Sequence, residues 1–237
     1  MYAATSSANI ENTQGLHSVA IPASRPAGRT TEYLPFTVRI ATSEADVAKA
    51  VQIRHEAYSR HLDPKVTEAL RQPEPLDASP GVVILLAESK LDGTPLGTMR
   101  IQTNRFRPLT LEQSIELPGW MNGKGLAEAT RLGITQDKIG RMVKTVLFKA
   151  YYLYCLQNDL QYMVITARSP IDRQYDRMLF QDVYPGMGYV PLEHVFNLPH
   201  RIMFLDVMGV EALWKSENHP WCDYMFHTDH PDLQVGA

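Results

Sequence analysis

The stretch Leu126-Ala-Glu-Ala-Thr-Arg-Leu-Gly-Ile134 decides the fold together with the residues that follow it. We expect this stretch to be a strand. A helix is expected over about residues 138–156, and it is apolar nearly all round, as a helix covered on two sides would be. A further strand is expected over residues 160–167. A strand, helix and strand in this order indicate a crossover connection with the helix on one face of a sheet.

The elements before and after this crossover extend the same sheet. Alternating residues 36–40 predict a half-buried strand, and Ser43 with Asp46 resembles a capping box that opens a helix to about residue 60. Two antiparallel strands follow, over residues 81–86 and 97–103, joined by an Asp-Gly turn. A short helix at 171–180 and strands near Tyr189 and at 201–207 complete the order. The pattern predicts an α/β fold with a mixed central sheet flanked by helices.

Three parts of the chain differ in composition. Residues 1–34 are rich in Ser, Thr, Ala and Pro and predict a disordered or loosely attached arm. Residues 35–208 hold the periodic elements and form the expected catalytic domain. Residues 209–237 form an acidic and aromatic extension.

Composition excludes several classes of protein. The 237 residues carry a formal net charge of −3, which gives no general basis for nucleic-acid binding. The two cysteines cannot form a disulfide framework, and no apolar run is long enough to cross a membrane. The first residues lack the features of a secretory signal, so a cytoplasmic location is expected. The histidines and cysteine near the C-terminus have no standard zinc spacing, and no metal site is expected.

Three short segments carry the candidate chemistry, and their order along the chain is informative. They are Arg54-His-Glu-Ala-Tyr58, Gly97-Thr-Met-Arg100 and Glu128-Ala-Thr-Arg131. These segments resemble motifs of the acyl-homoserine-lactone synthases, and more closely those of a sister family, the N-acyl amino acid synthases of the long-chain N-acyltyrosine type. The resemblance spans roughly residues 36–207. It implies the GCN5-related N-acyltransferase fold and the transfer of a long-chain acyl group from a thioester to the amine of an amino acid, with tyrosine as one acceptor.

Glu128 is the candidate catalytic residue. Aminolysis of a thioester requires a neutral amine and a group that removes its proton, and a carboxylate on a buried strand could do this. The alternative is a structural ion pair between Glu128 and Arg100 or Arg131.

Glu128 and Arg131 are three residues apart, so a regular strand would place them on opposite faces. They can share a site only if a β-bulge falls between them, near Ala129 or Thr130. Thr130 and Arg131 are therefore candidate substrate-binding residues. A bulge would also free backbone groups for the thioester arm.

Arg54, Tyr58 and Arg100 are the remaining candidates for substrate binding. Arg54 lies on the apolar stripe of its expected helix, with Tyr58 one turn further on, where the family usually has phenylalanine. The two could form a wall of the amine pocket, or Arg54 could instead form a core salt bridge. Arg100 lies on a polar strand face, which could simply be solvated. Tyr175 lies where many relatives of this fold carry a tyrosine that protonates the leaving thiolate, although packing is the simpler role.

The acyl donor is predicted from a missing motif. Acetyl-CoA-dependent relatives carry a glycine-rich loop at a helix start, whereas residues 136–143 here keep only Gly140. Residues 100–149 contain nine Lys and Arg against four Asp and Glu. This excess suits an acidic acyl carrier protein that presents the donor on a phosphopantetheine arm, with no separate cofactor. The predicted docking residues are Lys138, Gly140, Arg141 and Lys144, and a solvated helix face is the alternative.

Three other functions are compatible with parts of the sequence. A homoserine-lactone synthase that uses S-adenosylmethionine would carry a tryptophan and an acidic pair between the first helix and the middle strand. Asp77 is present in that segment, but no tryptophan occurs there. An acetyl-CoA-dependent N-acetyltransferase would need the missing phosphate loop. A non-catalytic module that binds lipid or carrier protein would not need Glu128.

Overall fold

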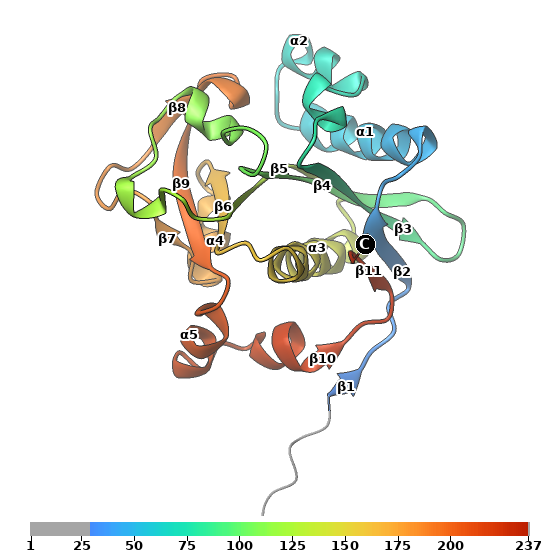
Figure 1. Cartoon of the computed structure of the whole chain (residues 1–237). Coiled ribbons are helices and arrows are strands. Elements are labelled where there is room, and N and C mark those ends of the chain that lie inside the picture. The colour runs from blue at the N-terminus through green and yellow to red at the C-terminus, as the bar shows by residue number, and fades with distance from the viewer. Residues whose placement is uncertain (1–28, 237) are drawn as a thin grey trace, which may run out of the picture.

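A computed structural model describes residues 29–236, so most of the predicted N-terminal arm lies outside the described residues. The core is a mixed sheet (Figure 1). Its strands, in spatial order, are β11 (Leu233–Gln234), β2 (Phe36–Ile40), β3 (Val82–Ser89), β4 (Pro95–Thr103), β5 (Leu126–Ile134), β6 (Tyr162–Ala167), β9 (Leu198–Asp206) and β7 (Gln181–Asp182). Two smaller pairings join β8 (Val190–Leu192) to β9, and β1 (Thr30–Thr31) to β10 (Thr228–Asp229).

Helices cover both faces of this sheet. The α-helices are α1 (Glu44–Ser59), α2 (Pro64–Thr67), α3 (Lys138–Gln157), α4 (Asp172–Arg177) and α5 (Val210–Ser216). Short 3-10 turns occupy Glu68–Arg71, Pro75–Ala78, Thr110–Gln113, Gly119–Met121 and Glu193–Val195, and a π-helical turn occupies Asp223–His227. Figure 1 shows α1 and α2 on one face of the sheet and α3 on the other. The predicted α/β class and the mixed sheet flanked by helices are confirmed.

The start of α1 follows from local chemistry. The Ser43 hydroxyl accepts from the backbone N–H of Asp46, whose carboxylate accepts from the backbone N–H of Ser43. This is the predicted capping box with aspartate in place of glutamate. The inner face of α1 packs on β3, β4 and β5, and this places Arg54 directly over the polar face of β4.

The two faces of β4 divide the interior. Met99 and Ile101 join the large apolar core beneath α3, while Thr98, Arg100 and Gln102 face the α1 side. These three polar residues are at most 2% exposed, so this face is buried. Solvation of this face, one of the two possibilities considered above, does not occur.

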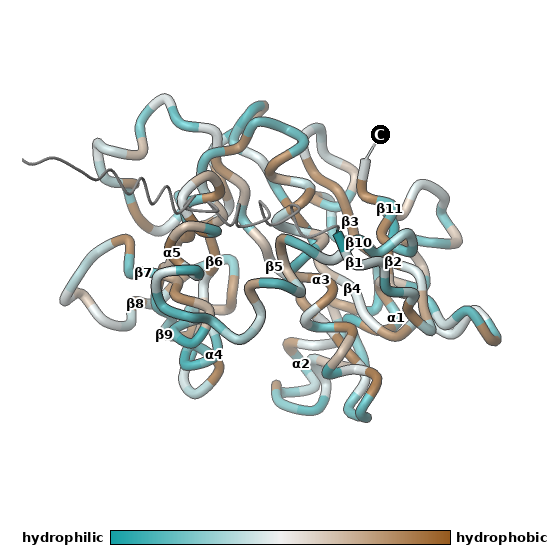
Figure 2. Tube along the Cα trace, turned by 90° about the horizontal axis from the view of Figure 1, so that it is seen from below, coloured by the Kyte–Doolittle hydropathy of each residue, from teal (hydrophilic) through white to brown (hydrophobic). Residues whose placement is uncertain are grey.

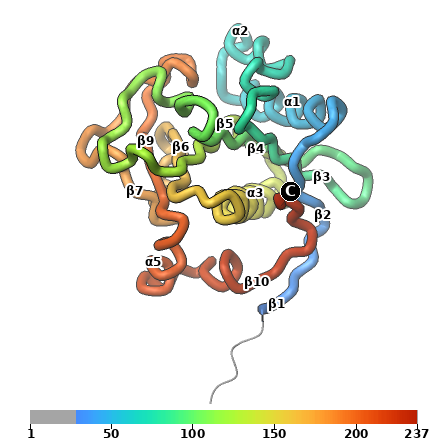
Figure 3. The backbone as a smooth tube through the Cα atoms, viewed as in Figure 1, coloured from blue at the N-terminus to red at the C-terminus, as the bar shows by residue number. Residues whose placement is uncertain are grey.

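Helix α3 lies between the sheet and the C-terminal segment, as its apolar character predicted. The Tyr152 ring contacts Phe226, and the Lys149 ammonium donates to the backbone carbonyl of Tyr224. Figure 2 shows α3 near the middle of the molecule with hydrophobic residues along it. Figure 3 shows the chain after β9 passing beneath α3 to reach β11, the edge strand beside β2. Among residues 29–236, no helix is long and apolar enough to cross a membrane.

Candidate active site

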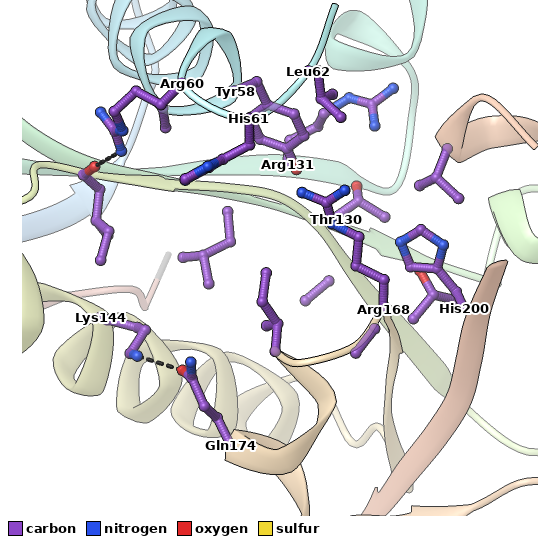
Figure 4. A pocket seen from close by; sticks show the side chains of 18 of the residues that line it. Tyr58, Arg60, His61, Leu62, Thr130, Arg131, Lys144, Arg168, Gln174 and His200 are labelled. Carbon is purple, nitrogen blue, oxygen red and sulfur yellow. Dashed lines mark hydrogen bonds between the residues drawn. The ribbon is translucent and has the colours of Figure 1, made fainter. Parts of the chain in front are cut away.

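A cavity of about 380 Å³ lies where β5 and β6 separate. The two parallel strands pair only through residues 126–129 of β5 and 162–165 of β6. Beyond Ala129 the strands diverge, and residues from α1, α3, α4 and the 193–200 segment close the space between them (Figure 4). The backbone of β5 that faces this gap has no partner strand on that side.

The charge of the cavity wall is strongly one-sided. No aspartate or glutamate within residues 29–236 belongs to the lining. Five permanent cations do, and they are Arg60, Arg131, Arg141, Lys144 and Arg168. Apolar side chains from the end of α1, from β5 and from α4 form much of the rest. A ligand with an apolar part and at least one anionic group matches this wall.

Three arginines meet two carboxylates on the α1 side of the sheet. Arg54 forms a two-pronged ion pair with Asp77, at 2.8 and 3.0 Å, and Arg100 donates to Glu74 at 2.9 Å. Arg131 grips Glu74 through Nε and Nη2, both at 2.7 Å. This arginine cluster joins α1, β4, β5 and the 74–77 turn.

Burial and ion pairing act in opposite directions on the acids of the arginine cluster. Burial raises the pKa of Glu74 and of Asp77, but the arginine partners outweigh it, and both pKa values fall below their usual range. Both carboxylates are therefore ionised at neutral pH and hold the guanidinium groups in fixed positions. Burial of such charges is tolerated because each has a hydrogen-bonded partner.

The predicted substrate-binding residues divide between the cavity and its support. Tyr58, Thr130 and Arg131 line the cavity. Arg54 and Arg100 do not, and Arg54 is fully buried behind the lining. Arg100 donates to the Thr130 hydroxyl at 3.1 Å, so it contacts a lining residue.

The predicted irregularity in β5 is present one residue further along than expected. Between Thr130 and Gly133 the pairing with β4 shifts by one residue, and Arg131 has a φ of 55°. This left-handed residue turns the Arg131 side chain toward Glu74, on the face that also carries Glu128 and Thr130. A positive φ at arginine costs free energy, and the two-pronged ion pair with Glu74 compensates for it.

Glu128 is completely buried beside the cavity but does not line it. One of its oxygens accepts from the backbone N–H of Leu111 at 3.3 Å, and the other lies 3.4 Å from Nε2 of His194. Burial raises the pKa of Glu128 to about 7. A carboxyl group with this pKa can both hold and release a proton near neutral pH.

His194 connects Glu128 with the cavity. Its Nε2 lies 3.5 Å from the hydroxyl of Thr166, a lining residue, and its own side chain is 3% exposed. Burial, followed by the charge of Arg131, lowers the pKa of His194 to about 4. The imidazole is therefore neutral and lies between Glu128 and a hydroxyl that faces the cavity.

The start of α3 forms the opposite rim of the cavity. The Asp137 carboxylate accepts from the backbone N–H of Gly140 at 2.7 Å and from the Thr135 hydroxyl at 2.9 Å. These hydrogen bonds lower the pKa of Asp137, so the helix start already holds an anion. Arg141 and Lys144 line the cavity from this helix, and Lys138 lies at its first position without lining it.

Tyr175 lies in α4 and lines the cavity, and its pKa is raised by burial. Its ring packs edge-on against Phe148 and Phe180. The hydroxyl is therefore protonated at neutral pH, as a donor to a leaving thiolate must be.

Several residues of the site were not predicted from the sequence. Glu74 lies in a proline-rich connection that reads as a loop, and His194, His200 and Arg168 lie at or beyond strand ends. The sequence signal for Glu74 was its spacing from Asp77, because two acidic residues three positions apart on a single helical turn point to the same side. Among residues 29–236, no cluster of three or more His, Cys, Asp or Glu side chains could hold a metal ion.

Comparison with solved structures places this fold among the acyltransferases. The structure of FeeM, an N-acyl amino acid synthase from uncultured soil microbes, matches with a TM-score of 0.60 and 18% identity, over 77% of this chain and 96% of that one. BjaI, a CoA-dependent acyl-homoserine lactone synthase solved with isopentyl-CoA, matches with a TM-score of 0.55 and 14% identity, over 82% and 93%. An aminoglycoside N(6')-acetyltransferase from Legionella pneumophila matches with a TM-score of 0.50 and 14% identity, over 76% and 96%.

These likenesses establish the GCN5-related N-acyltransferase fold. Comparison with curated proteins gives no match. The sequence model of the family described as N-acyl amino acid synthase FeeM matches residues 49–199, which include all three motifs, the arginine cluster, Glu128 and His194. The chain is therefore an N-acyltransferase that belongs to the FeeM family of N-acyl amino acid synthases.

Proposed function

We propose that this enzyme transfers a long-chain acyl group from the phosphopantetheine thioester of acyl carrier protein to the α-amine of an amino acid. The observation that carries the proposal is the cavity between β5 and β6, to which residues 29–236 contribute five cationic side chains and no carboxylate. Both substrates bring an anion to it, a phosphodiester on the donor arm and a carboxylate on the acceptor. The apolar part of the wall suits the acyl chain.

The reaction forms one bond and breaks one. The amine nitrogen attacks the thioester carbonyl, the carbon–sulfur bond breaks, and an amide and a free thiol result. An ammonium group enters with three protons and the amide keeps one, so two protons must leave the nitrogen. One is accepted by a base of the enzyme, and the other leaves with the thiol.

Glu128 is the proposed acceptor of the amine proton. It does not line the cavity, so the amine proton is passed by way of the Thr166 hydroxyl, which lies 3.5 Å from Nε2 of His194. In the tautomer with hydrogen on Nδ1, Nε2 takes this proton on its lone pair and passes it to Glu128, whose oxygen lies 3.4 Å from the same nitrogen. The pKa of about 7 at Glu128 is matched to this role near neutral pH. Tyr175, which lines the cavity from α4, is the proposed donor to the leaving thiolate.

Support for a carrier-protein donor comes from the start of α3. In many relatives of this fold a helix start binds the pyrophosphate of CoA through free backbone N–H groups. Here the Asp137 carboxylate already occupies the N–H of Gly140, and its negative charge opposes a second anion there. A phosphopantetheine arm carries no pyrophosphate and can enter beside Arg141 and Lys144.

The test is a substrate screen with purified enzyme. Palmitoyl carrier protein and palmitoyl-CoA are each offered with every common amino acid, tyrosine first, and the products are identified by mass spectrometry. We expect an N-acyl amino acid from the carrier-protein donor at a much higher kcat/KM than from CoA. Equal use of the two donors would remove the carrier protein from the proposal, and acylation of simple amines alone would remove the amino acid.

A further inference from the structure

Arg168 and Arg141 are the two lining arginines whose guanidinium groups have no hydrogen-bond or ion-pair partner among residues 29–236, and of these Arg168 lies at the end of β6 rather than on α3. It follows the last residue of β6 and lines the cavity, and its side chain is partly buried. Its guanidinium forms no hydrogen bond or ion pair with any of residues 29–236. Figure 4 shows the side chain of Arg168 extending into the cavity toward Thr130. A half-buried guanidinium without a partner offers several donors to a planar anion.

The arginines of the three sequence motifs are already engaged. Arg54 and Arg100 do not line the cavity and are held by Asp77 and Glu74. Arg131 lines it, but its Nε and Nη2 donate to Glu74, and its Nη1 and Nη2 also donate to the backbone carbonyl of His194. A substrate carboxylate could recruit Arg54 or Arg100 only by displacing a carboxylate partner, and Arg131 only through Nη1, which already donates to the carbonyl of His194.

His200 is a titratable neighbour of Arg168, whose charge contributes to the lowered pKa of the His200 imidazole. It comes from β9, lies beside Arg168 in Figure 4, and lines the cavity. Its Nδ1 lies 2.8 Å from the carbonyl oxygen of Leu198. A carbonyl only accepts, so Nδ1 carries the proton and Nε2 keeps a lone pair. Burial, followed by the charge of Arg168, lowers the pKa of His200, so the ring is neutral at pH 7.

We propose that Arg168 and His200 form the receptor for the amino acid acceptor, with Arg168 binding its α-carboxylate and Nε2 of His200 accepting a hydrogen bond from its α-amine. The pair offers a cation for the carboxylate and a neutral hydrogen-bond acceptor for the amine. These are the two groups that every α-amino acid carries on one carbon. The inference rests on the proposed function and names the residues that select the acceptor.

The position of the pair separates the acceptor from the donor. Arg141 and Lys144 lie on α3, at the other end of the cavity from Arg168 and His200 (Figure 4 labels Lys144, Arg168 and His200). The basic residues of α3 then meet the phosphate of the donor arm, and Arg168 meets the carboxylate. Thr166 lies in β6, two residues before Arg168, and its hydroxyl lies 3.5 Å from Nε2 of His194. The bound amine is thus placed near the start of the proton path.

The experiment compares each amino acid with its decarboxylated amine. The probes are tyrosine with tyramine and leucine with isoamylamine, and the readout is the ratio of kcat/KM for acid over amine. Arg168→Met should lower this ratio at least about 30-fold, the loss expected when one member of a partly buried charge pair is removed. Arg168→Lys should recover part of it. Arg141→Met is the matched control, an unpartnered arginine at the donor end, and should leave the ratio unchanged.

His200→Gln provides an independent readout. Both the acid and the amine carry the nitrogen that His200 accepts from, so this variant should raise KM for both and leave their ratio unchanged. Retention of the wild-type ratio in Arg168→Met would overturn the inference, because the carboxylate would then be held elsewhere.

Binding without turnover separates this inference from the proposed function. Equilibrium dialysis of labelled tyrosine against wild type and Arg168→Met needs no acyl donor. Arginine-dependent binding without any acylation would sink the proposed function and keep the acceptor site. Acylation of tyrosine that does not depend on Arg168 would keep the proposed function and sink the acceptor site.

Discussion

At the scale of single residues, Glu128 is the group on which the proposed chemistry depends most. Glu128→Gln keeps the shape of the side chain and removes its ability to accept a proton, so kcat should fall about 100-fold or more. In the wild type, kcat should rise with pH through about 7, where Glu128 loses its proton. Steady-state rates over a pH series check both. A rate within a few-fold of wild type in the variant would exclude Glu128 as the base.

The Glu128 and His194 pair also predicts opposite effects of pH on stability. The pKa of Glu128 is raised from 4.5 to about 7 on folding, so the folded state binds more protons between these values and stability falls as pH rises. The pKa of His194 is lowered from 6.5 to about 4, so the unfolded state binds more protons and stability rises with pH. Between pH 4.5 and 6.5 the two contributions oppose each other in the wild type.

Single variants should reveal each contribution separately. Relative to wild type, Glu128→Gln should become more stable by about 2 kcal/mol as pH rises from 4.5 to 6.5, because only the His194 contribution remains. His194→Gln should become less stable by a similar amount over the same range. Urea unfolding at the two pH values measures both. Identical pH dependence in the two variants would contradict the buried, neutral pair.

At the scale of elements, the start of α3 depends on one glycine. A Cβ atom added at Gly140 would lie 2.0 Å from the carbonyl oxygen of Thr135, which is backbone and cannot move without shifting the end of β5. Gly140→Ala should therefore destabilise the protein by about 1–3 kcal/mol. Gly119→Ala is the control, because a Cβ at Gly119 meets nothing within 4 Å. Thermal unfolding of the two variants gives the comparison.

The exposed side of the same helix start is the predicted docking surface for the carrier protein. Reversal of Lys138, Arg141 and Lys144 to Glu should raise KM for acyl carrier protein at least about tenfold, and added salt should weaken wild-type binding in the same direction.

The control for this reversal carries the same change of charge elsewhere. Reversal of Lys65, Arg107 and Lys124, which are exposed and do not line the cavity, should leave KM nearly unchanged. An equal effect of both triple variants would assign the result to net charge rather than to docking.

The elements show how far the sequence alone could lead. Residues 36–40 and 126–134 were predicted as strands with the bounds that the structure has, because alternation and apolar runs report burial directly. The start of α1 was predicted from its capping box. Helix α5 was not predicted. The strands β1, β7, β10 and β11 were not predicted either, because a strand of two residues is set by tertiary pairing and leaves no periodic signal in the sequence.

The candidate site was less accessible to prediction than the fold. Glu128, Arg100 and Arg131 could be named because they belong to short motifs whose order and spacing resemble those of a known family. Glu74, His194 and Arg168 come from connections and strand ends, and only the folded chain brings them to the same place. The substrate contact predicted for Arg54 stays a prediction. Its side chain is fully buried and holds Asp77 and Glu74 in position.

At the scale of the whole molecule, the C-terminal extension wraps under α3 and returns to the sheet. Lys149 donates to the carbonyl groups of Tyr224 and Thr228 and lies 2.9 Å from Nδ1 of His230. The Asp232 carboxylate then accepts from the backbone N–H of Leu34, and β11 pairs in parallel with β2. Residues 209–236 of the extension are thus packed as a structural part of the catalytic domain.

The pairing of β11 with β2 also bears on how copies of this protein behave toward one another. A strand whose backbone groups lack a neighbour is a template for joining a second chain, and β11 covers the outer edge of β2. A variant that ends at Pro231 should expose that edge and should form concentration-dependent aggregates in light scattering, whereas a variant that ends at Val235 should stay monodisperse. The four residues from 232 to 235 would then decide whether the protein remains in solution at high concentration.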